Sequence, residues 1–213
     1  MNGWHIDTQC VQEGWKPRNG DPRVVPIVQS TTFRYESAEA LGDLFDLKTS
    51  GDFYTAFQPN TKLVFGESLS NPSLHVLDFE RFAQVAHAHG VPLVVDNTFP
   101  TPVNCRPFAF GADIVVHSTS KYLDGHAAAL GGVIVDSGRF DWTAQAEKFP
   151  GLTTPDETYH GVIYTEHFGT AAFIAKCRCH LMRDMGVTPS PENAFLLDRG
   201  IDTLHLRMER HCS

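Results

Sequence analysis

Two stretches in the middle of the chain decide the fold: VPLVVDNTF at residues 91–99 and GADIVVHSTSKY at residues 111–122. Each contains an apolar run without alternation, which is the pattern of a strand covered on both faces of a parallel sheet. Each run is followed by a polar segment. Ligands of open α/β sheets bind at the carboxyl ends of the strands, so these polar segments are the first place to look for function.

Short β-rich runs alternate with a helical pattern around these two stretches. The helical pattern has apolar residues at three- and four-residue steps, with Asp78 placed to cap its start and Gly90 placed to end it. The expected elements are strands at 62–67, 91–96, 112–117 and 131–136 and a helix at 77–89. This alternation predicts an α/β fold with a mostly parallel sheet and flanking helices.

The chain is predicted to have three parts. Residues 1–55 are expected to form an N-terminal arm and helix, because prolines are frequent and periodic apolar positions are few before residue 35. Residues 56–190 hold the α/β domain and close with a helical pattern at 158–186. A new helix begins after Pro191, so residues 191–213 are expected to start a further domain.

Composition excludes several classes of protein. With 213 residues, 42% of them hydrophobic, the chain has the composition of a globular protein. The formal charge of -8 gives no basic surface for nucleic acid or anionic membrane. The longest apolar run, within 91–95, is far shorter than the roughly 20 residues of a membrane span, and the N-terminus lacks a signal pattern. We expect a cytoplasmic protein.

The cysteines favour the same compartment. There are five of them, an odd number without a Cys-x-x-Cys pair, which favours reduced thiols. Cys177 and Cys179 stand close to His180, the combination of a thiolate and imidazole metal site. Residues two positions apart point to different sides of a helix, so no metal is expected there.

The polar segments contain the groups that pyridoxal 5'-phosphate (PLP) requires. A lysine amine forms a Schiff base with the aldehyde of this cofactor, and a carboxylate pairs with its pyridinium nitrogen. Lys121 and Asp96 supply these groups, and Ser118 and Ser120 flank the lysine where hydroxyls could bind the phosphate. Taken singly, each residue has an ordinary structural explanation, as a cap, a turn residue or a solvated side chain.

The whole set of motifs resembles the Cys/Met-metabolism family of PLP enzymes, which includes cystathionine synthases and lyases, methionine γ-lyase and the homoserine sulfhydrylases. The resemblance covers nearly the whole chain and rests first on 96–99, 111–122 and Gly125-His126. Four further segments are typical of the O-acetylhomoserine sulfhydrylases: 29–32, 131–138, 140–142 and 149–156. The implied fold is the large domain of a fold-type I PLP-dependent transferase.

Residue roles follow from the resemblance, position by position. Lys121 corresponds to the lysine that holds the cofactor and shuttles protons, and Asp96 to the partner of the pyridine nitrogen. Asn71, in a Ser-Asn-Pro turn, resembles the residue that binds the ring oxygen of the cofactor. Thr98 resembles one that lies against the ring.

Phosphate binding is implied for three residues. Ser118 and Ser120 match phosphate ligands of the family, although the second position is more often Thr in relatives. Tyr54 matches a tyrosine that reaches the phosphate of the neighbouring subunit. The resemblance therefore also implies a homo-oligomer, a dimer of dimers that share active sites.

The sequence departs from the family pattern after Thr55. Relatives continue with an arginine and Asn-Pro, whereas Ala56-Phe57-Gln58 follows here. A stretch the size of a small domain is absent. In relatives, the resemblance implies, this stretch carries an arginine that binds the cofactor phosphate, a Ser-Gly turn that also binds the phosphate, and a tyrosine that stacks on the cofactor ring. The substrate-carboxylate arginine of the C-terminal domain is not present either. Both the PLP domain and the site are thus expected to be incomplete, through a deletion or because these residues belong to a longer chain.

The implied reaction is a γ-replacement on a small amino acid. Sulfide or methanethiol displaces the acetoxy group of O-acetyl-L-homoserine, which gives homocysteine or methionine and acetate. Two alternatives stay open. One is a cystathionine γ-synthase or a methionine or cystathionine γ-lyase. Assays with cysteine as the nucleophile and with methionine as the substrate would distinguish these enzymes from a sulfhydrylase. The other is a non-catalytic fragment that acts only through oligomer contacts.

Overall fold

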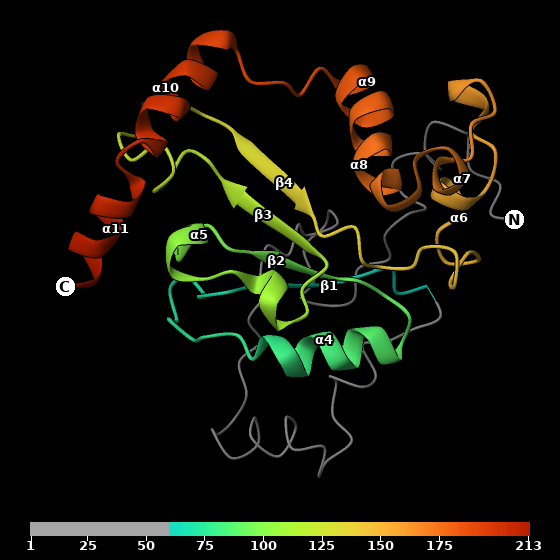
Figure 1. The fold of residues 1–213 in the computed structure, drawn as a ribbon, viewed down its shortest axis with the longest axis horizontal. Coiled ribbons are helices and arrows are strands. Elements are labelled where there is room, and N and C mark those ends of the chain that lie inside the picture. The colour runs from blue at the N-terminus through green and yellow to red at the C-terminus, as the bar shows by residue number, and fades with distance from the viewer. Residues whose placement is uncertain (1–59) are drawn as a thin grey trace, which may run out of the picture. The chain divides into compact units, whose positions relative to one another are not determined.

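The computed structural model describes residues 60–213, and these residues form a four-stranded sheet at their centre. The strands follow the order β1-β2-β3-β4, as Figure 1 shows. The first three strands are parallel, and β4 runs antiparallel to β3. Their bounds are Val64–Glu67 for β1, Leu93–Asp96 for β2, Ile114–Ser118 for β3 and Gly132–Asp136 for β4. All four expected strands are present, with ends that differ by one or two residues.

Helix α4 (Phe79–Ala88) covers one face of this sheet. Asp78 caps it as expected, since its Oδ1 accepts a hydrogen bond from the N–H of Arg81 at 3.2 Å. The helix ends before Gly90, which has a φ of 61° that favours glycine. Ala83 and Ala86 are the most buried residues of α4 and pack in one cluster with residues of β2 and β3.

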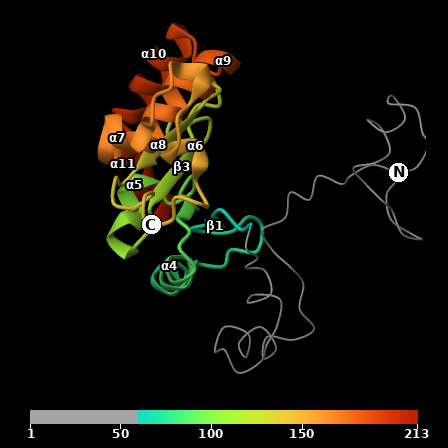
Figure 2. The ribbon, with the colours of Figure 1, turned by 90° about the vertical axis from the view of Figure 1, so that its right-hand side faces the viewer.

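The two central strands are buried on both faces, as their apolar runs predict. Val95 and Val115 face the cluster that contains α4. Val94 and Ile114 face the opposite side and pack in a second cluster with Trp142, Tyr164 and Ala172. Figure 2 shows α4 on one side of the strands and the helices of the second cluster on the other. The sheet is therefore the middle of three layers.

The helical pattern at 158–186 is divided into short pieces. Positive φ angles at His160 and Gly161 end the first turn, and Gly169, at 52°, ends the second. The pieces between 150 and 185 are α6 (Pro150–Thr153), η2 (Glu157–Tyr159), α7 (Tyr164–Phe168), η3 (Gly169–Ala171), α8 (Ala172–Lys176), the π-helical η4 (Cys177–Met182) and α9 (Arg183–Met185). Apolar spacing alone indicates the buried face of these pieces but not the breaks between them.

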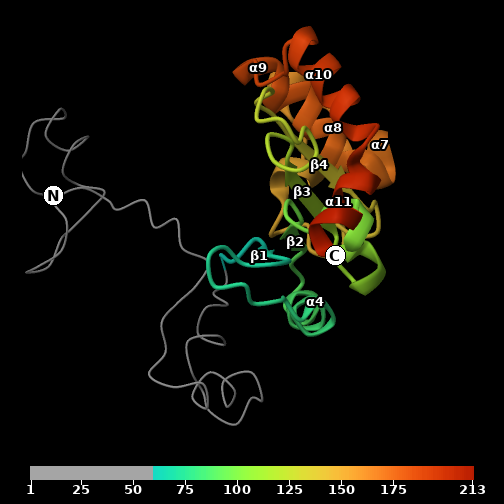
Figure 3. The same ribbon diagram turned by 90° about the vertical axis from the view of Figure 1, so that its left-hand side faces the viewer.

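Helices α10 (Pro191–Ile201) and α11 (Leu204–Cys212) follow. The Ser190 side chain caps α10 by accepting from the N–H of Asn193 at 3.1 Å. Figure 3 shows α10 farther from α4 than α11, which lies level with the strands. Two short turns follow β2, α5 (Thr101–Asn104) and η1 (Pro107–Phe110), and Asn104 Nδ2 donates to Cys212 Sγ of α11 at 3.2 Å.

Strand β4 is the least covered element of the sheet. Val133, Ile134 and Val135 are 39%, 48% and 40% exposed, in contrast to the buried residues of β2. Within residues 60–213, no helix is long and apolar enough to cross a membrane. The predicted arm at 1–55 lies outside the described residues, and the predicted domain boundaries stay predictions.

Candidate active site

The carboxyl ends of the three parallel strands meet at one edge of the sheet. Glu67 lies opposite Asp96 in the register of β1 and β2, and Asp96 lies opposite Val116 in that of β2 and β3. Ser68 fixes the first of these junctions, because its N–H and its hydroxyl both donate to the Asp96 carbonyl, at 2.9 and 3.0 Å. The segments that follow three parallel strands, which hold most of the predicted site residues, are thus brought to a common edge.

Asp96 and Thr98 form the centre of this edge. Asp96 Oδ1 accepts a hydrogen bond from the N–H of Thr98 at 2.9 Å. Thr98 Oγ1 in turn accepts from the N–H of Ser118 at 2.8 Å, which ties the end of β2 to the end of β3. Among the described residues, Asp96 Oδ2 accepts no hydrogen bond.

The segment after β3 carries the lysine in a closed loop. The Thr119 carbonyl accepts from the N–H of Asp124 at 3.0 Å, and the Lys121 carbonyl accepts from the N–H of Gly125 at 2.7 Å. Ser120 Oγ accepts from the N–H of Gly131 at 3.1 Å. The Lys121 residue itself is exposed. The backbone of the lysine is therefore held by hydrogen bonds while its amine reaches solvent.

Asn71 lies in an exposed turn after β1. Its N–H donates to Glu67 Oε2 at 3.1 Å, which holds the turn against the end of the strand. The turn is closed by Ser70, whose N–H donates to the His75 carbonyl at 2.9 Å. Tyr54, the remaining predicted site residue, lies outside the described residues.

A buried histidine lies next to the site. His117 on β3 is 6% exposed, and burial lowers the pKa of its imidazole, while the nearby Asp96 carboxylate opposes that shift. Its Nδ1 is buried and makes no hydrogen bond within the described part of the chain. A neutral imidazole is favoured at this position.

Sequence reasoning missed two polar residues that shape the lysine loop. Asp124 is 1% exposed, and its Oδ2 accepts from the N–H groups of His126 and Ala128 at 3.2 and 2.9 Å. Burial favours the neutral carboxyl, but these backbone donors outweigh it and the pKa of Asp124 is lowered. Arg207 of α11 donates to the carbonyl of Tyr122 at 2.6 Å. Spacing along the sequence gives no signal for either contact.

Residues 42–213 match the family model of the Cys/Met-metabolism PLP-dependent enzymes. The chain belongs to this family. The match includes the central strands, the lysine loop and both final helices, and it confirms the family that the motifs indicate. The predicted α/β fold, with the mostly parallel sheet of fold-type I PLP enzymes, is confirmed as well.

Named relatives are similar over most of the chain. A homocysteine/cysteine synthase of Kluyveromyces lactis is 50% identical over 163 residues, which are 76% of this chain and 37% of that protein. An O-acetyl-L-homoserine sulfhydrylase of Corynebacterium glutamicum is 48% identical over 73% of this chain and 36% of its own length. A solved structure from Campylobacter jejuni contains N'-pyridoxyl-lysine-5'-monophosphate; it is 35% identical with a TM-score of 0.69, over 75% of this chain and 39% of that one.

The chain spans less than half the length of these relatives. The described residues nevertheless suit the family's cofactor. A carboxylate with one oxygen unengaged stands at the end of β2, and an exposed lysine stands on the loop after β3. This donor set matches the pyridinium nitrogen and the aldehyde of PLP.

Proposed function

We propose that this chain carries the lysine-bearing part of an O-acetylhomoserine sulfhydrylase. The reaction is the replacement of the acetoxy group of O-acetyl-L-homoserine by sulfide or methanethiol, which yields homocysteine or methionine and releases acetate. The observation that carries the proposal is the junction of Asp96, Thr98 and Ser118 at the edge from which Lys121 emerges. The relatives named for this reaction share that part of the chain.

The protein groups divide the work between binding and proton transfer. When bound, PLP supplies a ring that withdraws electrons from the α-carbon of the amino acid. The Asp96 carboxylate would hold the proton of the ring nitrogen, while the hydrogen bond from the Thr98 N–H to Oδ1 fixes the direction of the carboxylate. The Lys121 amine binds the cofactor and then moves protons between substrate carbons.

The segment after β3 is proposed to bind the phosphate of the cofactor. The Ser118 and Ser120 hydroxyls flank Lys121 and are proposed to donate to the phosphate, together with backbone N–H groups of the same segment. The Asn71 amide is proposed to bind the ring oxygen, and Tyr54 the phosphate of a second subunit. We also propose a homo-oligomer, which the resemblance to the family implies, and a location in the cytoplasm, which the odd number of cysteines supports.

The test uses the 213-residue chain with added PLP. We expect a visible absorbance band and, after borohydride, one covalent adduct that the Lys121→Ala variant lacks; Lys62→Ala, which alters another exposed lysine, is the matched control. In a cofactor-loaded, full-length form of the protein, acetate release from O-acetyl-L-homoserine should depend on sulfide. The absence of a Lys121-dependent adduct would refute the proposal and favour a non-catalytic role. Turnover with cysteine as nucleophile, or with methionine as substrate, would instead indicate a synthase or lyase of the same family.

A further inference from the structure

Arg207 of α11 connects three backbone carbonyls from two distant parts of the chain. Its Nη1 donates to the Tyr122 carbonyl at 2.6 Å. Its Nη2 donates to the Gly200 carbonyl at 2.6 Å and to the Leu123 carbonyl at 3.4 Å. Tyr122 and Leu123 directly follow Lys121 in the sequence. The guanidinium therefore joins the loop that carries the lysine to the last turn of α10.

Only arginine can make this set of contacts with one side chain. Its guanidinium is planar, always charged and presents five N–H donors in a fixed arrangement, whereas a lysine amine is a single point of donation. The Nε of Arg207 donates to Thr203 Oγ1 at 3.1 Å, which fixes the orientation of the plane from within its own helix. Hydrogen bonds from a charged donor are stronger than those between neutral groups.

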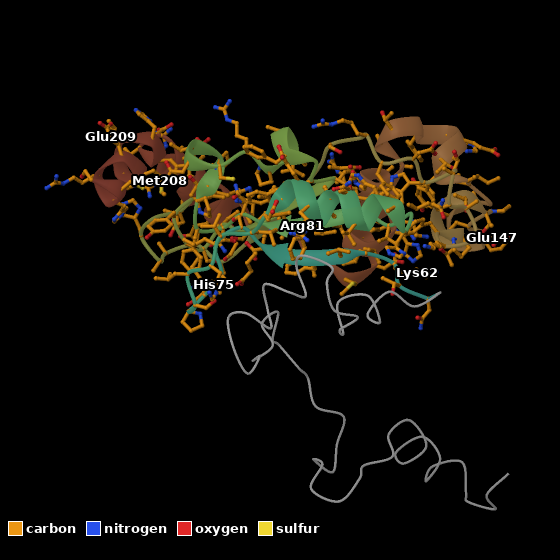
Figure 4. The ribbon with its side chains drawn as sticks, turned by 90° about the horizontal axis from the view of Figure 1, so that it is seen from below. Lys62, His75, Arg81, Glu147, Met208 and Glu209 are labelled. Carbon is orange, nitrogen blue, oxygen red and sulfur yellow. The ribbon has the colours of Figure 1, made fainter. Side chains whose placement is uncertain are left out.

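The lysine loop packs closely against α10 and Arg207. A Cβ at Gly200 would contact the carbonyls of Leu123 and Asp124, the first at 2.8 Å. A Cβ at Gly125 would lie 2.6 Å from Arg207 Cζ. Leu123 is also buried in one apolar cluster with Leu204 and Met208 of α11. Figure 4 labels Met208 and Glu209 on this helix, at the opposite end of the described fold from Lys62 and Glu147.

We infer that Arg207 is the positioning residue of Lys121: by holding the two carbonyls that follow it, Arg207 fixes the backbone from which the lysine amine reaches the cofactor. Lys121 is exposed, so the backbone that carries it sets the region that its amine can reach. This inference rests on the proposed function for its chemical consequence, but the hold on the loop is a property of the chain alone.

Hydrogen exchange of the backbone amides tests the hold without any cofactor. The informative amides are those of Asp124 and Gly125, which close the loop on the carbonyls of Thr119 and Lys121. In Arg207→Met, which keeps an unbranched apolar side chain without the donors, we expect both amides to exchange about tenfold faster, with the amides of β3 unchanged. In Arg207→Lys, the exchange rates of these two amides should lie between those of the parent and those of Arg207→Met.

Arg210→Met is the control, because it removes a positive charge from the same helix without touching the lysine loop. Arg210 is exposed on the same helix, and its side chain makes no hydrogen bond or ion pair within residues 60–213, so this variant should match the parent. Unchanged exchange at Asp124 and Gly125 in Arg207→Met would overturn the inference. Equal acceleration throughout β3 would overturn it too, because it would show a global loss of stability.

The second readout is the yield of the borohydride-trapped Lys121 adduct at limiting PLP. We expect the order parent and Arg210→Met, then Arg207→Lys, then Arg207→Met, with about a tenfold higher PLP concentration needed for half-maximal trapping in Arg207→Met. Equal trapping in all four would contradict the inference. If the parent itself forms no adduct, the proposed function fails, and the exchange data alone then decide whether Arg207 holds the loop.

Discussion

Thr98 and Ser118 join the ends of the two central strands through a side-chain hydrogen bond. Thr98 Oγ1 accepts from the N–H of Ser118 at 2.8 Å, and Thr98 is only 7% exposed. The bond is therefore partly shielded from water, and loss of its acceptor would leave a poorly solvated N–H group without a partner. Thr98 also touches the candidate site through its own N–H on Asp96, so one residue serves both the fold and the site.

Replacement of the Thr98 hydroxyl should destabilise this junction. Thr98→Val keeps the shape of the side chain but leaves the Ser118 N–H without its acceptor, and we expect the free energy of unfolding to fall by about 1–3 kcal/mol. Thr98→Ser should retain most of the stability, since it keeps the acceptor. Denaturant unfolding of both variants beside the parent measures the difference. Equal stability of Thr98→Val and the parent would show that the bond contributes nothing.

Asp124 should make the lysine loop sensitive to acid. The pKa of Asp124 is lowered in the folded state because backbone N–H groups donate to its ionised form in spite of its burial. A lowered carboxyl pKa gives stability that is present above the ordinary value of about 3.9 and is lost as the pH falls through the folded pKa. Below that pH the free energy of unfolding of the parent should decline as the pH falls, and we expect this decline to be less steep in Asp124→Asn.

The control for this acid response is Asp198→Asn, whose side chain is 73% exposed. It should leave the slope of stability against pH as it is in the parent. A slope in Asp124→Asn that equals the parent slope would contradict the prediction. Unfolding should be followed by a probe of the whole fold, such as far-ultraviolet circular dichroism.

Gly200→Ala should reverse the usual effect of this substitution in a helix. Alanine is normally favoured over glycine within a helix by about 0.5–1 kcal/mol. At position 200 the new methyl group would meet the backbone carbonyls of Asp124 and Leu123, which cannot turn aside as a side chain can. We expect a loss of about 1–3 kcal/mol, the range for overpacked sites.

Gly151→Ala is the matched control for Gly200→Ala. Gly151 lies in α6, and a methyl group there would have no atom of the described neighbours within 4 Å. This variant should be neutral or more stable. Thermal unfolding of the two variants compares them directly, and a stabilised Gly200→Ala would mean that α10 does not pack closely on the lysine loop.

Lys176 should control the titration of Asp156 on the far side of the sheet. Lys176 Nζ donates to Asp156 Oδ2 at 2.6 Å, and this contact is the main reason that the pKa of Asp156 lies well below its ordinary value. Lys176→Met should therefore raise the pKa of Asp156. Carboxyl titration by nuclear magnetic resonance gives the value, with Arg178→Met, an exposed cation two residues away, as the control. An unchanged titration in Lys176→Met would contradict the prediction.

The part of the fold that sequence could predict is the part with strong local patterns. The runs at 93–95 and 114–116 are apolar without alternation, and burial on both faces follows directly from that. Asp78 and Gly90 mark the ends of α4 because capping and positive φ depend on a few adjacent residues. The helical pattern at 158–186 was less informative, since the breaks at His160 and Gly169 leave the apolar spacing intact.

The candidate site shows the same limit. Asp96, Ser118 and Lys121 could be proposed because strand ends in a parallel sheet converge wherever the strands themselves are recognised. The supporting contacts of Asp124 and Arg207 go to backbone carbonyls and N–H groups, which every residue has. The sequence therefore does not indicate which backbone groups Asp124 and Arg207 contact, and only the folded chain shows these contacts.

The link between Arg207 and the Tyr122 carbonyl spans 85 residues, and this separation sets an order of events during translation. A ribosome that adds about 5–20 residues per second needs roughly 4–17 seconds to pass from residue 122 to residue 207. Over that interval the strands can form, but the guanidinium that holds the lysine loop has not yet been made. A nascent chain can thus form its sheet before the contacts that fix the backbone after Lys121, because those contacts need α11.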